Sequence, residues 1–194
     1  MYKIQFKLTG FEFKPDYFTK LLGFIHKCLG KNDLHNDISL YSYSHIHNNS
    51  FTFVSYNINV IDKIVKGAMF YKKMFDNCEV VSFKLIHIIY QKNVFKCASP
   101  FFVKDSENKH LIFKEAELQV KSTLIKKAAR ANIDLSDFDI EFINFEKTKL
   151  IKIHEINNKC FVSSVKIHGN DTVKSFACQV GLGNSTGCGF GFIY

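Results

Sequence analysis

The order of alternating and helical segments in the first half of the chain constrains its fold most. Residues 2–8 alternate apolar and polar side chains with a period of two, as a half-buried strand does. Residues 16–29 place apolar side chains on one helical face and end at Gly30, a residue typical of the position after a helix. The chain is therefore expected to begin with a strand followed by a helix.

The rest of this half continues the same alternation of strands and helices. Residues 38–44 and 50–56 both alternate, and the His-Asn-Asn stretch between them has turn chemistry, which predicts a hairpin. Helical spacing returns over residues 60–75, and residues 79–89 form a long run rich in strand formers. The resulting order, βαββαβ, is that of a ferredoxin-like domain, an antiparallel sheet with two helices on one face.

A similar set of elements follows Ala98–Pro100, which marks the expected domain boundary. The set comprises a strand at 110–113, a helix at 115–130, strands at 139–144, 150–156 and 160–167, and a short unassigned segment at 171–179. The sequence thus predicts an α+β protein of two tandem ferredoxin-like (βαββαβ, RRM-like) domains, residues 1–97 and 98–194. No residue-level repeat accompanies this duplication.

The C-terminal end concentrates half of the ten glycines of the chain within residues 181–191. Glycine adopts positive φ angles and lets another backbone approach closely, which suits a loop whose amides face an incoming phosphate. Leu182 and Phe190 would anchor such a loop to the core. A glycine-kinked final hairpin without a ligand is the alternative. A Walker loop is excluded because no Gly-Lys-Ser/Thr follows, and the spacing does not fit a dinucleotide-binding fingerprint.

The charge balance favours a polyanionic partner without proving one. Lysine and arginine number 26 against 18 aspartate and glutamate residues, a net charge of +8, and Arg130 is the only arginine. Lysine acts as a mobile point charge, which suits attraction to a phosphate backbone better than reading of bases. A genome rich in A and T would produce the same abundance of lysine, so the charge is open to either interpretation.

The cysteines and the N-terminus point to a reducing compartment. Six cysteines are scattered without a Cys-x-x-Cys pair, so neither a zinc knuckle nor a redox dithiol is indicated. The N-terminus has no charged-then-apolar leader, and the chain has no apolar run long enough to cross a membrane. We expect free thiols, a cytoplasmic location, no membrane association and no metal or other cofactor.

The glycine pattern resembles a family hallmark. The spacing Gly181-x-Gly183-x5-Gly189-x-Gly191 at the end of a doubled βαββαβ chain is similar to the glycine-rich loop of the CRISPR-associated RAMP proteins, and among them the Cas6 repeat-processing endoribonucleases. Residues 22–44 resemble the first helix, active-site loop and second strand of that family, and Ala98–Pro100 resembles its inter-domain Ser-Pro. The similarity spans nearly the whole chain.

The resemblance implies metal-independent cleavage within a CRISPR repeat transcript (pre-crRNA). The 2'-hydroxyl would attack the adjacent phosphorus and leave a 2',3'-cyclic phosphate and a 5'-hydroxyl. Such a reaction needs a base, an acid and a charge to stabilise the phosphorane, and histidine suits the first two roles near neutral pH. The family places its catalytic histidine at the position of His35, and many relatives carry a second His or a Tyr at the position of His26. Lys31 lies in the same predicted loop and is a candidate cation, although the loop has no lysine next to the second strand, where some relatives have one. His45 and His47 are substitutes for one partner.

Further residues are candidates for RNA contact. The glycine loop offers Gly181, Gly183, Asn184, Ser185, Thr186, Gly189 and Gly191. Tyr41 and Tyr43 share one face of a strand and either stack bases or pack in the core. The helix at 115–130 carries Lys121, Lys126, Lys127 and Arg130, which would follow an RNA backbone unless they form an ordinary solvated face.

The expected partners are CRISPR repeat RNA, other CRISPR effector subunits and a second copy of the chain. Two alternatives stay open. The first is a noncatalytic RNA-binding subunit of a CRISPR effector, in which the histidines are incidental. The second is a protein interaction scaffold whose charge reflects genome bias.

Overall fold

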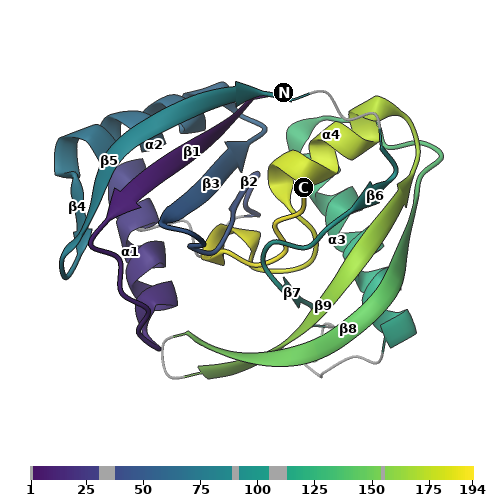
Figure 1. Ribbon diagram of the computed structural model, residues 1–194. Coiled ribbons are helices and arrows are strands. Elements are labelled where there is room, and N and C mark those ends of the chain that lie inside the picture. Colours follow the sequence, from purple (N-terminus) through teal and green to yellow (C-terminus); the bar gives the residue numbers. More distant parts are fainter. Residues whose placement is uncertain (1, 31–37, 89–91, 105–112, 154–155) are drawn as a thin grey trace.

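The computed structural model describes residues 2–30, 38–88, 92–104, 113–153 and 156–194 (Figure 1). Two antiparallel sheets stand side by side, and the C-terminal segment, yellow in the figure, lies between them. Among the described residues, no helix is long and apolar enough to cross a membrane.

The first sheet contains five strands in the order β2-β3-β1-β5-β4. They are β1 (Tyr2–Thr9), β2 (Tyr41–Tyr43), β3 (Ser50–Ser55), β4 (Lys73–Phe75) and β5 (Cys78–His87). The alternation of β1 buries Ile4, Phe6 and Leu8 against α1 (Tyr17–Leu29) and α2 (Ile58–Tyr71). The predicted βαββαβ order of this half is confirmed, with β4 as an addition.

Local chemistry sets the ends of these elements. Gly30 ends α1 with φ 66°, the left-handed conformation expected after a helix. Asn48 and Asn49 both have positive φ and form the tight turn of the predicted hairpin. The predicted helix at 60–75 is wrong at its end, because α2 stops at Tyr71, Lys72 turns with φ 49°, and residues 73–75 pair with β5.

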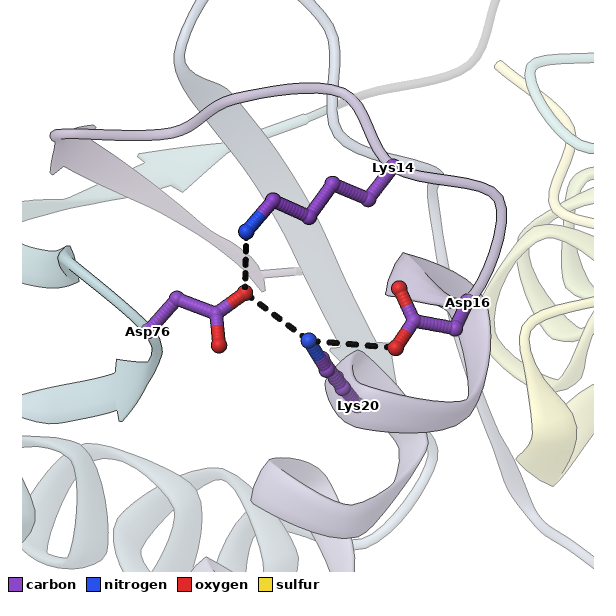
Figure 2. Close-up of polar contacts among 4 residues, drawn as sticks. All are labelled: Lys14, Asp16, Lys20 and Asp76. Atoms are coloured by element: carbon purple, nitrogen blue, oxygen red, sulfur yellow. Dashed lines mark hydrogen bonds and ion pairs between the residues drawn. The ribbon is translucent and has the colours of Figure 1, made fainter.

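A cluster of charges joins the β4–β5 turn to the start of α1 (Figure 2). Asp76 accepts hydrogen bonds from Lys20 at 2.8 Å and Lys14 at 3.2 Å, and Lys20 also pairs with Asp16 at 3.1 Å. The bonds from Lys20 and Lys14 lower the pKa of Asp76. All four side chains are open to solvent, so this network orients the turn more than it stabilises the fold.

The second sheet is built around β9 (Ile156–His168). Strand β8 (Asp139–Ile153) pairs along one edge of β9, and the short strands β6 (Val94–Phe95) and β7 (Phe101–Phe102) pair with its other edge. Helices α3 (Phe113–Ala131) and α4 (Asp171–Val180) cover a core that includes Val120, Phe176 and Val165.

The second half follows the predicted plan less closely than the first. Residues 139–144 and 150–153, predicted to lie in two strands, belong to one strand, β8, whose pairing with β9 shifts between Ile143 and Lys147. Of the rest of the second predicted strand, residues 154–155 lie outside the described residues and Ile156 opens β9. Of the strand predicted at 110–113, residues 110–112 lie outside the described residues and Phe113 opens α3. Strands β6 and β7 were not predicted. Strand β6 precedes residue 98 and yet pairs with β9 in the second sheet. The domain boundary at 97/98 therefore stays a prediction.

The C-terminal segment 182–194 extends the second sheet along β6 and β7. Lys96 and Tyr194 exchange two backbone hydrogen bonds of 3.0 Å, and Asn184 donates its backbone N–H to Phe102 at 2.8 Å. Ser99 connects this edge to the first sheet, since its hydroxyl donates to the Tyr43 carbonyl at 3.3 Å and accepts the Phe192 N–H at 3.1 Å. The end of the chain therefore ties the two sheets together.

Candidate active site and RNA interface

The glycine segment, residues 181–191, begins where α4 ends and folds back on itself. Gly181, Gly183, Gly189 and Gly191 all have φ between 64° and 85°, a region that strongly favours glycine. Leu182 donates its backbone N–H to the Gly191 carbonyl at 2.9 Å. The Leu182 carbonyl in turn occupies the space where a Cβ of residue 191 would stand. Main chain thus packs against main chain within the segment.

The same glycines face groups from both sheets. A Cβ on Gly183 would lie 2.7 Å from the Phe102 carbonyl of β7, and one on Gly189 would lie 2.8 Å from the Tyr43 ring of β2. Gly181, Gly183, Gly189 and Gly191 are buried. The prediction that these glycines leave bare main chain for RNA is therefore wrong for Gly181, Gly189 and Gly191, because other parts of the protein already occupy that space. The RNA contact of Gly183 stays a prediction, because this residue lines a cavity.

The tip of the segment, Asn184 and Ser185, reaches solvent. Ser185 is exposed and left-handed, with φ 53°, and Asn184 is half-buried. The Asn184 side chain accepts the Lys104 N–H at 3.1 Å, which holds the tip against the second sheet. Thr186 is buried, so its predicted RNA contact is also corrected. Among the described residues, no backbone acceptor takes the N–H groups of Gly183 and Ser185.

Lys127 departs most from its predicted role. The prediction placed it on an RNA-facing helix surface, but its side chain is buried, with 5% exposure. Its ammonium donates to the Val180 carbonyl at 3.0 Å, the Gly181 carbonyl at 2.9 Å and Thr186 Oγ1 at 3.0 Å. Burial lowers the pKa of Lys127 to about 7, while the three acceptors favour the charged form. The Lys127 ammonium therefore contacts the glycine segment in place of the predicted contact with RNA.

A cavity of about 400 Å³, here called the junction cavity, brings both halves of the chain together. The first half contributes His26 of α1 and the stretch leading into β2, and α3 contributes Lys126. The full lining is His26, Ile38, Ser39, Tyr41, Gln119, Thr123, Lys126, Lys127 and residues 183–188. An imidazole, an exposed ammonium and the tip of the glycine segment therefore share one concave site.

His35 and Lys31 lie outside the described residues. The nearest described residues on either side are Gly30, which ends α1, and Ile38, which lines the junction cavity. The roles predicted for His35 and Lys31 therefore stay predictions. His26 is half-buried on the last turn of α1 and belongs to the same cavity.

Tyr41 and Tyr43 belong to the core of the first sheet. Their exposures are 4% and 1%, and both rings stack on Phe53, at centroid distances of 5.3 and 6.4 Å. The core-packing alternative is therefore correct for both, and the prediction that they stack bases is wrong. Burial raises the pKa of both phenols above the ordinary range.

The basic helix α3 presents its remaining cations in different ways. Lys126 is exposed at the junction cavity. Arg130 is exposed and lines a neighbouring cavity of about 380 Å³ with Lys63 of α2. Lys121 pairs with Asp139 of β8 at 3.0 Å. Lys126 and Arg130 stay the strongest candidates for contact with a phosphate backbone.

His45 is held as a neutral, structural histidine. Its ring meets Phe18 edge-on at 4.3 Å. Burial lowers the pKa of His45 to about 3, against the opposing effect of a hydrogen bond with the Gly189 backbone. Such an imidazole is a poor proton donor near neutral pH, so His45 is a weak substitute for either catalytic partner. Within the described residues, no group of three or more His, Cys, Asp or Glu side chains could hold a metal ion.

Comparison with known protein families shows which family the chain belongs to. Residues 83–194 match the family model described as CRISPR associated protein Cas6, C-terminal, which covers more than half of the sequence. The chain belongs to the Cas6 family. No curated protein matches the sequence.

Solved structures extend the Cas6 similarity over the whole chain. The structure of a CRISPR associated protein Cas6 is 20% identical, with a TM-score of 0.81 over 100% of this chain and 98% of that chain. A Cas6-related protein from Pyrococcus furiosus is 19% identical, with a TM-score of 0.80 and coverages of 99% and 97%. A RAMP protein binding different RNA substrates is 18% identical, with a TM-score of 0.79 and coverages of 100% and 98%. Cas6 product complexes are also similar. The tandem ferredoxin-like fold is confirmed.

Sequence reasoning missed the role of Lys127, although a signal for it exists. Lys127 follows Val120 by seven residues and Leu124 by three, which places it on the apolar face of α3. A lysine on that face must find acceptors inside the fold. The identity of those acceptors depends on where the distant glycine segment packs.

Proposed function

We propose that this Cas6 family member binds CRISPR repeat RNA and cleaves it once, without a metal ion. The observation that carries the proposal is the junction cavity, where His26, Lys126 and the tip of the glycine segment meet. Family membership makes repeat RNA the natural substrate.

The proposed chemistry is an internal transfer at phosphorus. One histidine takes the proton of the 2'-hydroxyl, and the 2'-oxygen bonds to the phosphorus as the bond from phosphorus to the 5'-oxygen breaks. The second histidine gives a proton to that 5'-oxygen. The products are a 2',3'-cyclic phosphate and a 5'-hydroxyl. His35 and His26 are the proposed pair, and Lys31 is the proposed cation for the phosphorane.

The electrostatics of the site support binding of a polyanion. Lys126 of α3 is exposed at the junction cavity, and Arg130 lines the neighbouring one. With a net charge of +8, the chain should attract RNA in a salt-dependent manner. Amides at the tip of the glycine segment would add uncharged donors for phosphate oxygens.

The test uses labelled repeat RNA in EDTA. The wild-type protein should give one cut with a cyclic phosphate end, and RNA with a single 2'-deoxy substitution at that position should bind but stay intact. His35→Ala should lower cleavage by about 100-fold or more, while RNA affinity stays nearly unchanged. His87→Ala, an exposed histidine on β5, is the matched control. Binding without any cut would instead identify a noncatalytic RNA-binding subunit, and unchanged cleavage by His35→Ala would reject the assignment of that residue.

A further inference from the structure

Lys127 joins a rigid helix to the glycine segment at three points. It stands on the buried face of α3, near Thr123 and Leu124. From there its ammonium bonds to the last residue of α4, the first glycine of the segment, and the side chain of Thr186. In sequence, these acceptors lie on both sides of the tip, Asn184 and Ser185.

The match between donors and acceptors is complete. An ammonium has three N–H donors, and three oxygens lie between 2.9 and 3.0 Å from Nζ. Removing the ammonium would leave two buried carbonyls and one buried hydroxyl without this donor, which is costly inside a protein. With a neutral or shorter side chain at residue 127, the glycine segment should therefore move away from α3, because staying in place would leave these groups unpaired.

We propose that Lys127 is a positioning residue that holds the tip of the glycine segment open to the junction cavity for RNA. The inference rests on the proposed function, because it assigns Lys127 a role in RNA binding. Lys127 acts through Thr186 and the segment backbone, whereas Lys126, its neighbour in sequence, is exposed at the cavity. Two adjacent lysines thus have different tasks.

Two pairs of variants separate positioning from general stability. Lys127→Met removes the charge and keeps the length of the side chain, and Lys66→Met removes an exposed lysine on α2 as a control. Thr186→Val removes one acceptor, whereas Thr186→Ser keeps it. If Lys127→Met fails to fold, the Thr186 pair still tests the inference, since neither variant removes a buried charge.

The first readout is affinity for repeat RNA with a 2'-deoxy group at the cut site. We expect the dissociation constant to rise about 10-fold or more for Lys127→Met, which is the loss of about 1.4 kcal/mol of binding free energy, and less for Thr186→Val. Thr186→Ser and Lys66→Met should bind as the wild type does. In cleavage of the natural RNA, KM should rise while kcat at saturation changes much less, a split that general destabilisation does not produce.

The second readout, amide hydrogen exchange without RNA, distinguishes failure of this inference from failure of the proposed function. Exchange at Cys188 and Gly189, whose N–H groups bond within the segment, should accelerate in Lys127→Met and Thr186→Val while exchange in β9 stays constant. Unchanged exchange, or unchanged RNA affinity in a folded Lys127→Met protein, overturns the inference. Absence of RNA binding by the wild type rejects the proposed function and the RNA role of Lys127 together, and exchange still decides whether Lys127 holds the segment.

Discussion

Leu182 and Gly191 touch through main chain alone: the Leu182 N–H bonds to the Gly191 carbonyl at 2.9 Å, and the Leu182 carbonyl fills the place of a side chain at residue 191. This contact closes the glycine segment between the two sheets. It makes the segment part of the core as well as part of the candidate RNA interface.

Gly191→Ala should destabilise the protein by about 2–5 kcal/mol. A left-handed alanine costs about 1–2 kcal/mol, and overpacking against fixed backbone adds about 1–3 kcal/mol. Urea unfolding of the purified variant measures this loss. A stability equal to that of the wild type would mean that the segment does not pack as described.

Two helical glycines should respond to alanine in opposite directions. Gly67 of α2 faces the Cys28 backbone of α1, where a Cβ would lie 2.6 Å from the Cys28 Cα. Gly67→Ala should therefore cost about 1–3 kcal/mol despite the better helix propensity of alanine. Gly23 of α1 is exposed with no atom within 4 Å of such a Cβ, so Gly23→Ala should add about 0.5–1 kcal/mol. Thermal melts of both variants compare them directly.

Acid should destabilise the fold through His45. Its pKa is about 3 in the folded protein and 6.5 in an unfolded chain, so between these values the unfolded state binds more protons. The stability from neutral His45 is fully present above pH 6.5 and is lost as pH falls toward 3, by at most about 1.4 kcal/mol per pH unit. His45→Gln lacks this dependence, so the difference in unfolding free energy between wild type and variant should shrink from pH 7.5 to pH 5. A constant difference would contradict the assignment.

His26→Ala should lower kcat of repeat cleavage by about 100-fold if His26 is one member of the acid and base pair. One limb of the pH–rate profile should disappear, while affinity for the 2'-deoxy RNA stays close to that of the wild type. Single-turnover rates between pH 5 and pH 9 provide the measurement. If the cleavage rate of His26→Ala falls by the same factor at every pH and both limbs remain, His26 only lines the cavity and is neither the acid nor the base.

The sequence by itself determined the elements of the first half, because their signals are local. Alternation defines β1, helical spacing and Gly30 define α1, and Asn48–Asn49 defines the hairpin turn. The glycine spacing, with residues 22–44 and Ala98–Pro100, indicated the family. In the second half the short strands β6 and β7 have too few residues for a periodic signal, and they exist only because β9 offers an edge.

Only the tertiary structure decided which side chains of the candidate site face solvent. Tyr41, Tyr43 and Lys127 look available in sequence, yet the glycine segment and the first sheet enclose them. Burial depends on which distant segments pack together, and a single local pattern does not encode that. The fold therefore turned Gly181, Gly189, Gly191 and Lys127 from expected RNA contacts into the support that presents Asn184 and Ser185.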